Sequence, residues 1–253
     1  MAKTRAARRG TVDPRELEKF SALAEEWWRT DGPFRQLHKL NPVRVAYARD
    51  RLAAHFRRDP LGRTPLRGLT ILDVGCGGGL VAEPMARLGA RVVGIDAAEA
   101  NIAVARAHAR DGKLAITYRR SSVESLARTG TRYDAILALE VIEHVGDLDV
   151  FLGACARLTA PGGALVLATL NRTLKSLALA VVLAEHVLGW VPRGTHDWRK
   201  FVRPDELGER LARHGVELRE VSGVTYNPLT DSWGLAADAG VNYMAFAARV
   251  PRR

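Results

Sequence analysis

The stretch Leu72-Asp73-Val74-Gly75-Cys76-Gly77-Gly78-Gly79 decides the fold of this chain of 253 residues. The apolar segment 70–74 is typical of a buried strand, and residues 80–88 have the spacing of a helix. Glycines between a strand and a helix let the backbone turn tightly and let a ligand approach the main chain. The stretch therefore predicts a ligand-binding loop.

The chain on both sides of this loop alternates between strand-like and helix-like patterns. Residues 161–163 predict a turn into the strand that follows them. Further strands are expected at 91–95, 116–119, 133–139, 164–169, 216–221 and 243–248, and further helices at 99–110, 148–158 and 206–214. Strand–helix–strand units at this spacing predict a parallel sheet with right-handed crossovers. The apolar strands indicate that helices cover both faces. The predicted fold class is α/β, a Rossmann-like, doubly wound, mostly parallel sheet.

An acid at the end of the second strand points to a nucleoside cofactor. Asp96 follows the glycine loop by about 20 residues, where a carboxylate accepts hydrogen bonds from ribose hydroxyls. The dinucleotide fingerprint requires a sixth-position glycine, but Leu80 stands there. Asp73 and the glycines at 75, 77 and 79 instead resemble motif I of class I S-adenosylmethionine-dependent methyltransferases. The expected cofactor is therefore S-adenosylmethionine (SAM).

These patterns divide the chain into one domain with additions. Residues 14–57 have helical spacing, interrupted at Gly32-Pro33 and Asn41-Pro42, which predicts two or three helices. The expected parts are a disordered basic tail over 1–13 and a single methyltransferase domain over 14–253. Within this domain we expect an N-terminal helical cap at 14–65, a cofactor-binding core at 66–170, an inserted lid or membrane segment at 171–203, and a C-terminal helix and strands at 204–253.

The chain is strongly basic, with a net charge of +10 and an isoelectric point of about 10.2. Such a charge suits nucleic acid, an anionic membrane surface or no specific partner. Aromatic residues make up 6% of the chain, and no basic stretch is interleaved with stacking aromatics, so no nucleic-acid partner is expected. Two cysteines in apolar sequence indicate a reducing compartment.

Several further segments resemble the O-methyltransferases of ubiquinone biosynthesis. They cover nearly the whole chain in the order of that family: Trp27-Trp28, Leu37-His38-Lys39-Leu40-Asn41-Pro42-Val43-Arg44, Glu140-Val141-Ile142-Glu143-His144-Val145, Thr169-Leu170-Asn171-Arg172, Gly194-Thr195-His196-Asp197-Trp198 and Tyr226-Asn227-Pro228. The resemblance implies SAM-dependent methylation of a phenolic hydroxyl on a polyprenylated benzene ring, at two steps of the pathway. It also makes other ubiquinone-biosynthesis enzymes candidate partners.

The same resemblance implies which residues contact the cofactor. From the family, Arg44, Gly75, Asp96 and Leu139 are expected to bind SAM. The Arg44 guanidinium suits the methionine carboxylate, and Leu139 would offer its backbone. Val123 follows the third strand, where this superfamily often contacts adenine.

A cluster after the fourth strand supplies candidates for the chemistry. A phenol has a pKa near ~10, so it needs a base or a cation to become a nucleophile. The spacing of Glu140, Glu143 and His144 predicts that they lie together on one helical turn. They could hold Mg²⁺ or another divalent cation, or His144 could accept the proton directly. Alternatively, the acids stabilise the start of a helix.

An apolar insertion is the candidate membrane contact. Residues 177–184 form an unbroken apolar run, and basic residues flank it at 172, 175, 193, 199 and 200. Such a segment can lie in a membrane interface or cover the active site as a buried lid. The expectation is that 172–193 binds an anionic membrane surface. The protein would then be cytoplasmic and peripheral on the inner face of a bacterial membrane.

Two other functions remain open from the sequence. The chain could methylate another small-molecule acceptor, or it could be a non-catalytic cofactor-binding scaffold in a biosynthetic complex. The intact cluster from Glu140 to His144 argues against a scaffold, because a domain without activity need not keep it.

Overall fold

The computed structural model describes residues 10–178 and 197–250. An eight-stranded sheet forms its centre, with the strand order β3-β2-β1-β4-β5-β8-β6-β7. The first five strands in this order pair in parallel, and β8, β6 and β7 continue the sheet in antiparallel pairs. The strands are β1 (Thr70–Val74), β2 (Arg91–Asp96), β3 (Thr117–Arg120), β4 (Tyr133–Leu139), β5 (Thr159–Leu170), β6 (Val216–Asn227), β7 (Ser232–Ala236) and β8 (Asn242–Arg249). The predicted fold class is confirmed.

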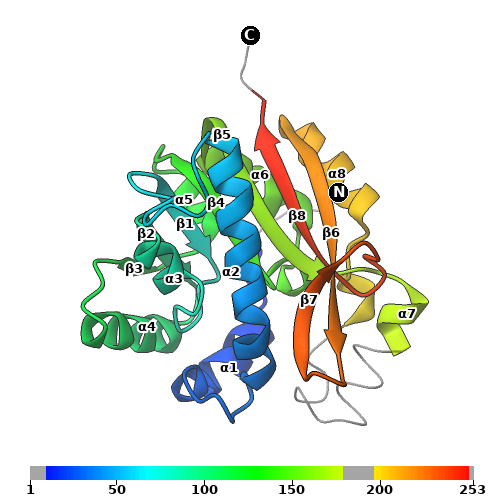
Figure 1. The fold of residues 1–253 in the computed structure, drawn as a ribbon, viewed down its shortest axis with the longest axis horizontal. Coiled ribbons are helices and arrows are strands. Elements are labelled where there is room, and N and C mark those ends of the chain that lie inside the picture. Colours follow the sequence, from blue (N-terminus) through cyan, green and yellow to red (C-terminus); the bar gives the residue numbers. More distant parts are fainter. Residues whose placement is uncertain (1–9, 179–196, 251–253) are drawn as a thin grey trace, which may run out of the picture.

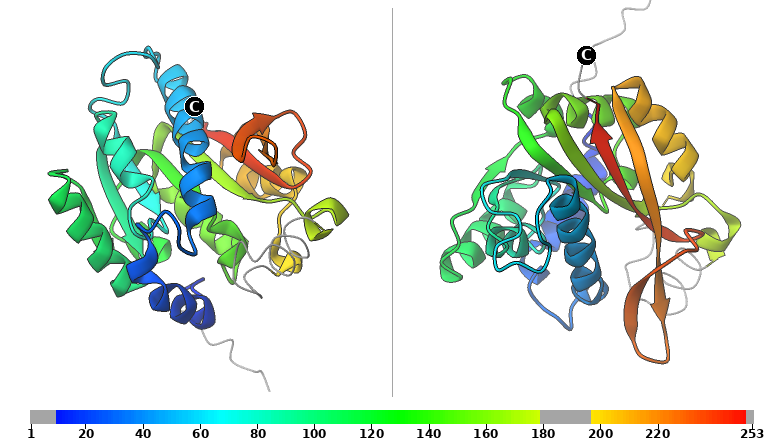
Figure 2. Two further views of the ribbon diagram at one scale, coloured as in Figure 1. Left: turned by 60° about the horizontal axis from the view of Figure 1, so that its bottom comes forward. Right: turned by 45° about the horizontal axis from the view of Figure 1, so that its top comes forward.

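Helices cover both faces of this sheet (Figures 1 and 2). Residues from α2, α3 and α4 belong to one buried cluster, and residues from α5, α6 and α8 belong to the other. The helices are α1 (Pro14–Ala22), α2 (Arg35–His55), α3 (Ala82–Arg87), α4 (Glu99–Asp111), α5 (Val123–Ala127), α6 (Leu148–Leu158), α7 (Leu174–Ser176) and α8 (Pro204–Arg213), with short 3-10 turns η1 (Ala24–Glu26), η2 (Ile142–His144) and η4 (Trp198–Lys200).

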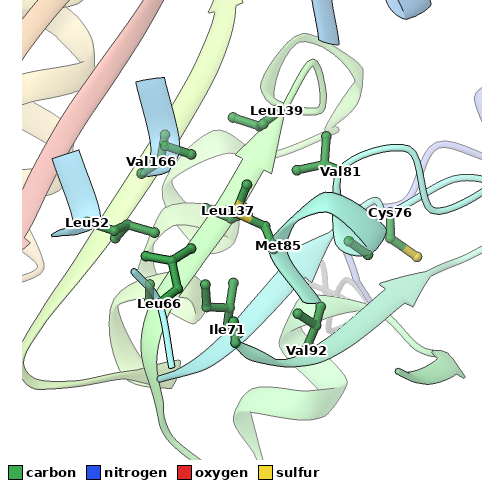
Figure 3. Close-up of a cluster of buried hydrophobic side chains, with 14 of the residues drawn as sticks. Leu52, Leu66, Ile71, Cys76, Val81, Met85, Val92, Leu137, Leu139 and Val166 are labelled. Carbon is green, nitrogen blue, oxygen red and sulfur yellow. The ribbon is translucent and has the colours of Figure 1, made fainter. Parts of the chain in front are cut away.

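The alternation of side chains along the strands fills the two clusters. Ile71 belongs to the cluster under α2 and α3, whereas Leu72, its neighbour on β1, belongs to the cluster under α6. Figure 3 shows the first cluster, in which Leu52 of α2 and Met85 of α3 lie over Leu137 of β4. All five side chains are fully buried. Burial of each contributes roughly 1.5–3 kcal/mol, so the strand ends that form the site rest on a rigid base.

Two expectations for the N-terminal part are wrong. The Asn41-Pro42 pair does not end a helix, because Pro42 lies inside α2. A proline there removes one helical hydrogen bond, but burial of Tyr47 and Leu52 holds the helix against the sheet. Residues 10–13 do not extend as a free tail, because Val12 forms a β-bridge with Val145.

The C-terminal part contains the other differences from the expected elements. Residues 161–163 lie inside β5 instead of preceding it, and the register of β5 against β4 shifts there. β6 continues to Asn227 and turns into β7, which forms a hairpin that the sequence patterns did not predict. Helix α5 was also missed. No helix in the described parts of the chain is long and apolar enough to cross a membrane.

Candidate active site

The glycine loop after β1 packs tightly against neighbouring segments of the protein. Gly75 and Gly77 have φ angles of 69° and 52°, which residues with a side chain rarely adopt. The N–H groups of Gly75 and Cys76 donate to Ile95 O at 2.8 and 3.0 Å. A Cβ on Gly75 would lie 2.5 Å from the Val141 side chain. A glycine at this position therefore lets the loop pack tightly against Val141, which follows β4.

Trp27, from the N-terminal part, closes the outer side of this loop. A Cβ on Gly77 would lie 2.4 Å from the Trp27 ring. Trp27 Nε1 donates to Asn101 Oδ1 at 2.9 Å, and its ring stacks on Phe34 with centroids 4.0 Å apart. The loop is thus held between the sheet and an aromatic pair.

Asp96, at the end of β2, is directed to the glycine loop. Its Oδ2 accepts from the Gly77 N–H at 3.0 Å, and its Oδ1 accepts from the Ala98 N–H at 2.8 Å. Burial raises the pKa of the Asp96 carboxyl, and the backbone hydrogen bonds oppose this rise. Because each carboxylate oxygen has two lone pairs, Asp96 can also accept hydrogen bonds from a ligand.

Arg44 and Asp73 are two buried residues of opposite charge on the cavity wall. Their residues are 4% and 3% exposed. Arg44 Nη2 donates to Asn41 Oδ1 at 3.0 Å, but among the described residues Arg44 Nε and Asp73 Oδ2 have no hydrogen-bond partner. Burial raises the pKa of Asp73 to about 7, and the charge of Arg44 opposes this rise. Unsatisfied buried polar atoms are costly, so both groups are suited to a ligand with complementary charges.

Glu140 follows β4 with its backbone in a left-handed conformation. Its φ is 58°, so it precedes the 3-10 turn η2 instead of belonging to one helical turn with Glu143 and His144. This corrects the predicted geometry of the cluster. Burial raises the pKa of Glu140 to about 7, helped by the charge of Glu143 and opposed by that of Arg44.

His144 is turned toward the N-terminal helix α1. Its Nδ1 lies 3.0 Å from Glu16 Oε2, and its ring meets Phe20 edge-on with centroids 5.2 Å apart. Burial lowers the pKa of His144, but the hydrogen bond to Glu16 and the charges of Glu143 and Glu16 outweigh it, so the pKa lies above its ordinary value. The imidazole is therefore oriented by a carboxylate from a distant segment.

Two of the three predicted metal ligands, Glu143 and His144, are bound to side chains outside the set. Thr169 Oγ1 donates to Glu143 Oε2 at 2.8 Å, whereas His144 pairs with Glu16. Among residues 10–178 and 197–250, no three His, Cys, Asp or Glu side chains are arranged to hold a metal ion. The arrangement of this donor set does not fit a three-ligand site, and the metal requirement stays a prediction.

A cavity of about 790 Å³ brings the predicted site residues together. All eight of them line it: Arg44, Gly75, Asp96, Val123, Leu139, Glu140, Glu143 and His144. Val123 begins α5 after its N-cap Ser122, and Leu139 ends β4. The carboxyl ends of the parallel strands thus form one wall, as expected for an open α/β sheet.

Sequence reasoning missed the residues that other segments bring to this cavity. Glu16 and Phe20 of α1, Trp27, and Tyr226 and Trp233 of the β6–β7 hairpin all line it. Trp27 and Tyr226 stood in segments that carried the family resemblance, but no role followed from that. Glu16 had no signal of its own, because its partner lies more than a hundred residues away.

Known proteins resemble this chain over nearly its whole length. A family model described as a methyltransferase domain matches residues 44–221. A ubiquinone biosynthesis O-methyltransferase from Chelativorans sp. (strain BNC1) is 56% identical over 95% of each chain. One from Parvibaculum lavamentivorans is 54% identical over 96% of each chain. The chain belongs to the ubiquinone biosynthesis O-methyltransferases. It is a SAM-dependent enzyme, and the predicted family, cofactor and reaction class are confirmed.

Solved structures support the fold independently. Magnesium protoporphyrin IX methyltransferase from Synechocystis PCC 6803 with bound SAH superposes with a TM-score of 0.64 at 21% identity, over 93% of this chain and 98% of that chain. At this identity the likeness concerns the fold. The residues of this O-methyltransferase fit SAM by their own chemistry, since Gly75 and Asp96 line the cavity and the buried Arg44 and Asp73 have unsatisfied atoms for a zwitterion.

Proposed function

We propose that this O-methyltransferase methylates the phenolic hydroxyl of polyprenylated benzenoid intermediates, at two O-methylation steps. The supporting observation is that one cavity joins the glycine loop to an apolar region. The chemistry-bearing residue His144 lines it together with Gly75 and Asp96, and aromatic side chains such as Phe20 and Trp233 line it as well. An apolar wall suits a lipid-like acceptor, because its burial removes apolar surface from water.

The cofactor would be held by groups of opposite charge. Arg44 would bind the methionine carboxylate and Asp73 the ammonium group, which would satisfy the two buried atoms that lack partners. Asp96 would accept from the ribose hydroxyls. Val123 would contact the adenine, and the backbone of Leu139 would complete the site. SAM supplies an electrophilic methyl group on a sulfonium, and the protein's task is to orient the acceptor in line with it.

The acceptor must lose a proton as the new bond to its oxygen forms. His144 is the proposed general base, and the carboxylate of Glu16 would stabilise the imidazolium that results. With Nδ1 paired to Glu16, Nε2 is the ring nitrogen that would receive the proton. No step assigned here uses a metal ion. Exhaustive chelation, followed by addition of magnesium, tests whether the reaction requires one.

Methyl transfer to defined acceptors tests the substrate class. Purified protein is incubated with radiolabelled SAM and either a prenylated catechol or the same ring without a tail. The expected product is a methyl ether, formed from the prenylated ring at the higher kcat/KM. Absence of label from both phenols would overturn the proposal. Transfer to ring carbon would replace it with C-methylation.

A peripheral membrane location at the cytoplasmic face is proposed from the insertion 172–193. Residues 179–196 lie outside the described part of the chain, so the support is the apolar and basic pattern of the sequence. The protein is expected to float with cardiolipin-rich vesicles and to dissociate as salt rises, because screening weakens its attraction to anionic lipid. Protein that stays in the aqueous fraction at low salt would contradict this location.

A further inference from the structure

The β6–β7 hairpin has two chemically different faces. Tyr226 pairs with Trp233, and Val224 pairs with Leu235. Because side chains alternate along a strand, these four lie on the same face. The opposite face carries small and polar residues, in the pairs Thr225–Gly234 and Asn227–Ser232. The hairpin thus presents an apolar, aromatic strip on one side.

The apolar face is held against the start of α2. Trp233 Nε1 donates to Gln36 Oε1 at 3.3 Å, and Trp233 packs against the buried cluster under α2. Near the hairpin turn, Asp231 forms ion pairs with Lys39 and, at 3.5 Å, with Arg35. Figure 1 shows the hairpin extending past the body of the sheet toward the end at which α1 lies. These contacts fix it as a wall of the cavity.

The cavity reaches this wall from the reaction centre. Glu140 after β4 and Trp233 of β7 both line it. Between β4 and β6 the sheet takes three strand steps, or about 14 Å at ~4.8 Å per step. That distance exceeds the size of a benzenoid ring. An acceptor ring beside His144 therefore does not fill the hairpin end of the cavity, which can hold another part of the acceptor.

Uncovered apolar side chains lie on the hairpin on either side of its aromatic pair. Leu229, in the turn of the hairpin, is 94% exposed, and Leu235 on the apolar face is 48% exposed. A single exposed leucine is ordinary on a protein surface. Leu235 pairs with Val224, on the side of the Tyr226–Trp233 pair away from the turn, and Leu229 lies in the turn itself. Uncovered apolar side chains therefore stand on both sides of the aromatic pair that lines the cavity.

We propose that the apolar face of the β6–β7 hairpin is the subsite for the isoprenoid tail of the acceptor, with Tyr226 and Trp233 flanking the tail and Leu229 contacting it as it leaves the protein. This assignment rests on the proposed function, because it presumes a prenylated acceptor. The ring is placed by the strand ends, and the tail by an element outside the parallel sheet.

Acceptors of different tail length test the subsite. The parent protein is given catechols with no tail and with one, two and three isoprene units, in a detergent without vesicles. KM should fall as the tail lengthens. In Trp233→Ala this dependence should flatten, with a loss of about tenfold in kcat/KM for the longest tail, since burial of about two methylene groups is worth this much. The tailless acceptor should be affected little.

Two exposed leucines, Leu229 and Leu61, provide a test and its control that do not depend on repacking the hairpin. Leu229→Ser should raise KM for the longest tail by about two- to fivefold. Leu61→Ser is matched in exposure, because Leu61 is 84% exposed, but Leu61 is not part of the hairpin, so the change should have no effect. Equal losses for tailed and tailless acceptors in both hairpin variants would overturn the subsite and leave the hairpin as a structural wall.

Photocrosslinking separates failure of the subsite from failure of the proposed function. A catechol whose isoprenoid chain ends in a photoreactive group should label peptides that contain residues 226–235. Labelling that falls elsewhere would overturn the subsite even if methylation proceeds. A protein that methylates neither acceptor but is labelled on the hairpin would refute the proposed reaction and retain the binding site.

Discussion

The cofactor half of the cavity is centred on one short stretch, residues 73–76, and on Asp96 at the end of the next strand, and Arg44, Val123 and Leu139 complete it from other elements. The acceptor half is assembled from α1, the turn after β4 and the β6–β7 hairpin. In the first, backbone conformation and close approach set the shape. In the second, side chains from segments more than a hundred residues apart meet. Cofactor binding and acceptor chemistry are therefore expected to respond separately to mutation.

The variant with the largest expected effect alters the acceptor half of the cavity alone. His144→Ala removes the proposed base, so kcat should fall by about 10²–10⁴-fold, whereas SAM affinity by calorimetry should stay within about twofold. His55→Ala is the control, because His55 hydrogen-bonds Gly162 O at 2.8 Å and does not line the cavity. Full turnover of His144→Ala would remove this residue from the mechanism.

The reciprocal change breaks the cofactor half. Gly75→Ala places a Cβ 2.5 Å from Val141 at a φ of 69°. Backbone strain alone costs ~1–2 kcal/mol of stability, but the clash should also move the loop, so SAM affinity should fall as well. Gly130→Ala separates the two costs, since Gly130 has a φ of 75° and nothing within 4 Å of the added Cβ. The Gly130 variant should lose stability in thermal unfolding but bind SAM normally. Equal SAM affinity in both variants would contradict the proposed role of the loop.

A smaller effect concerns the ribose contact. Asp96→Ala should weaken SAM binding by about 1–3 kcal/mol, the cost of lost hydrogen bonds to a buried partner. Asp96→Asn keeps one acceptor oxygen and should lose less. Calorimetry that finds unchanged affinity in both variants would exclude the ribose role.

The smallest effect sharpens the link between the N-terminal helix and the reaction. Glu16→Gln removes the charge that raises the pKa of His144, so kcat should fall by about two- to tenfold. Because the base must be neutral, the rise of kcat/KM with pH should move to lower pH. Glu18→Ala, an exposed acid on the same helix, should leave the profile unchanged. An unshifted profile in Glu16→Gln would separate Glu16 from His144.

The same pair also contributes to stability within a defined pH window. The hydrogen bond to His144 lowers the pKa of Glu16 from its ordinary value of 4.5, so this contribution is lost as pH falls through the lowered value. The pKa of His144 lies above its ordinary value of 6.5, so the contribution is lost as pH rises through the raised value. The difference in melting temperature between parent and Glu16→Gln should therefore be greatest between pH 4.5 and 6.5.

The sequence by itself determined the parallel sheet and the cofactor half. The ranges expected for β1, β4 and α6 agree with the structure, because these elements lie in the core and their pattern reflects burial. The glycine loop and Asp96 are close in sequence and carry a local conformational requirement. All eight expected site residues line one cavity, although the assignment of Arg44, Val123 and Leu139 to the cofactor came from the family resemblance.

Only the tertiary structure decided how the acceptor half is built. Pro42 predicted a break, but packing of α2 on the sheet overrides that local preference. The left-handed backbone conformation of Glu140 places this residue outside the turn that contains His144. Glu16 and Trp233 reach the cavity through packing between distant segments. No periodicity records such contacts, because they depend on where the folded chain returns to itself, and not on the order of neighbouring residues.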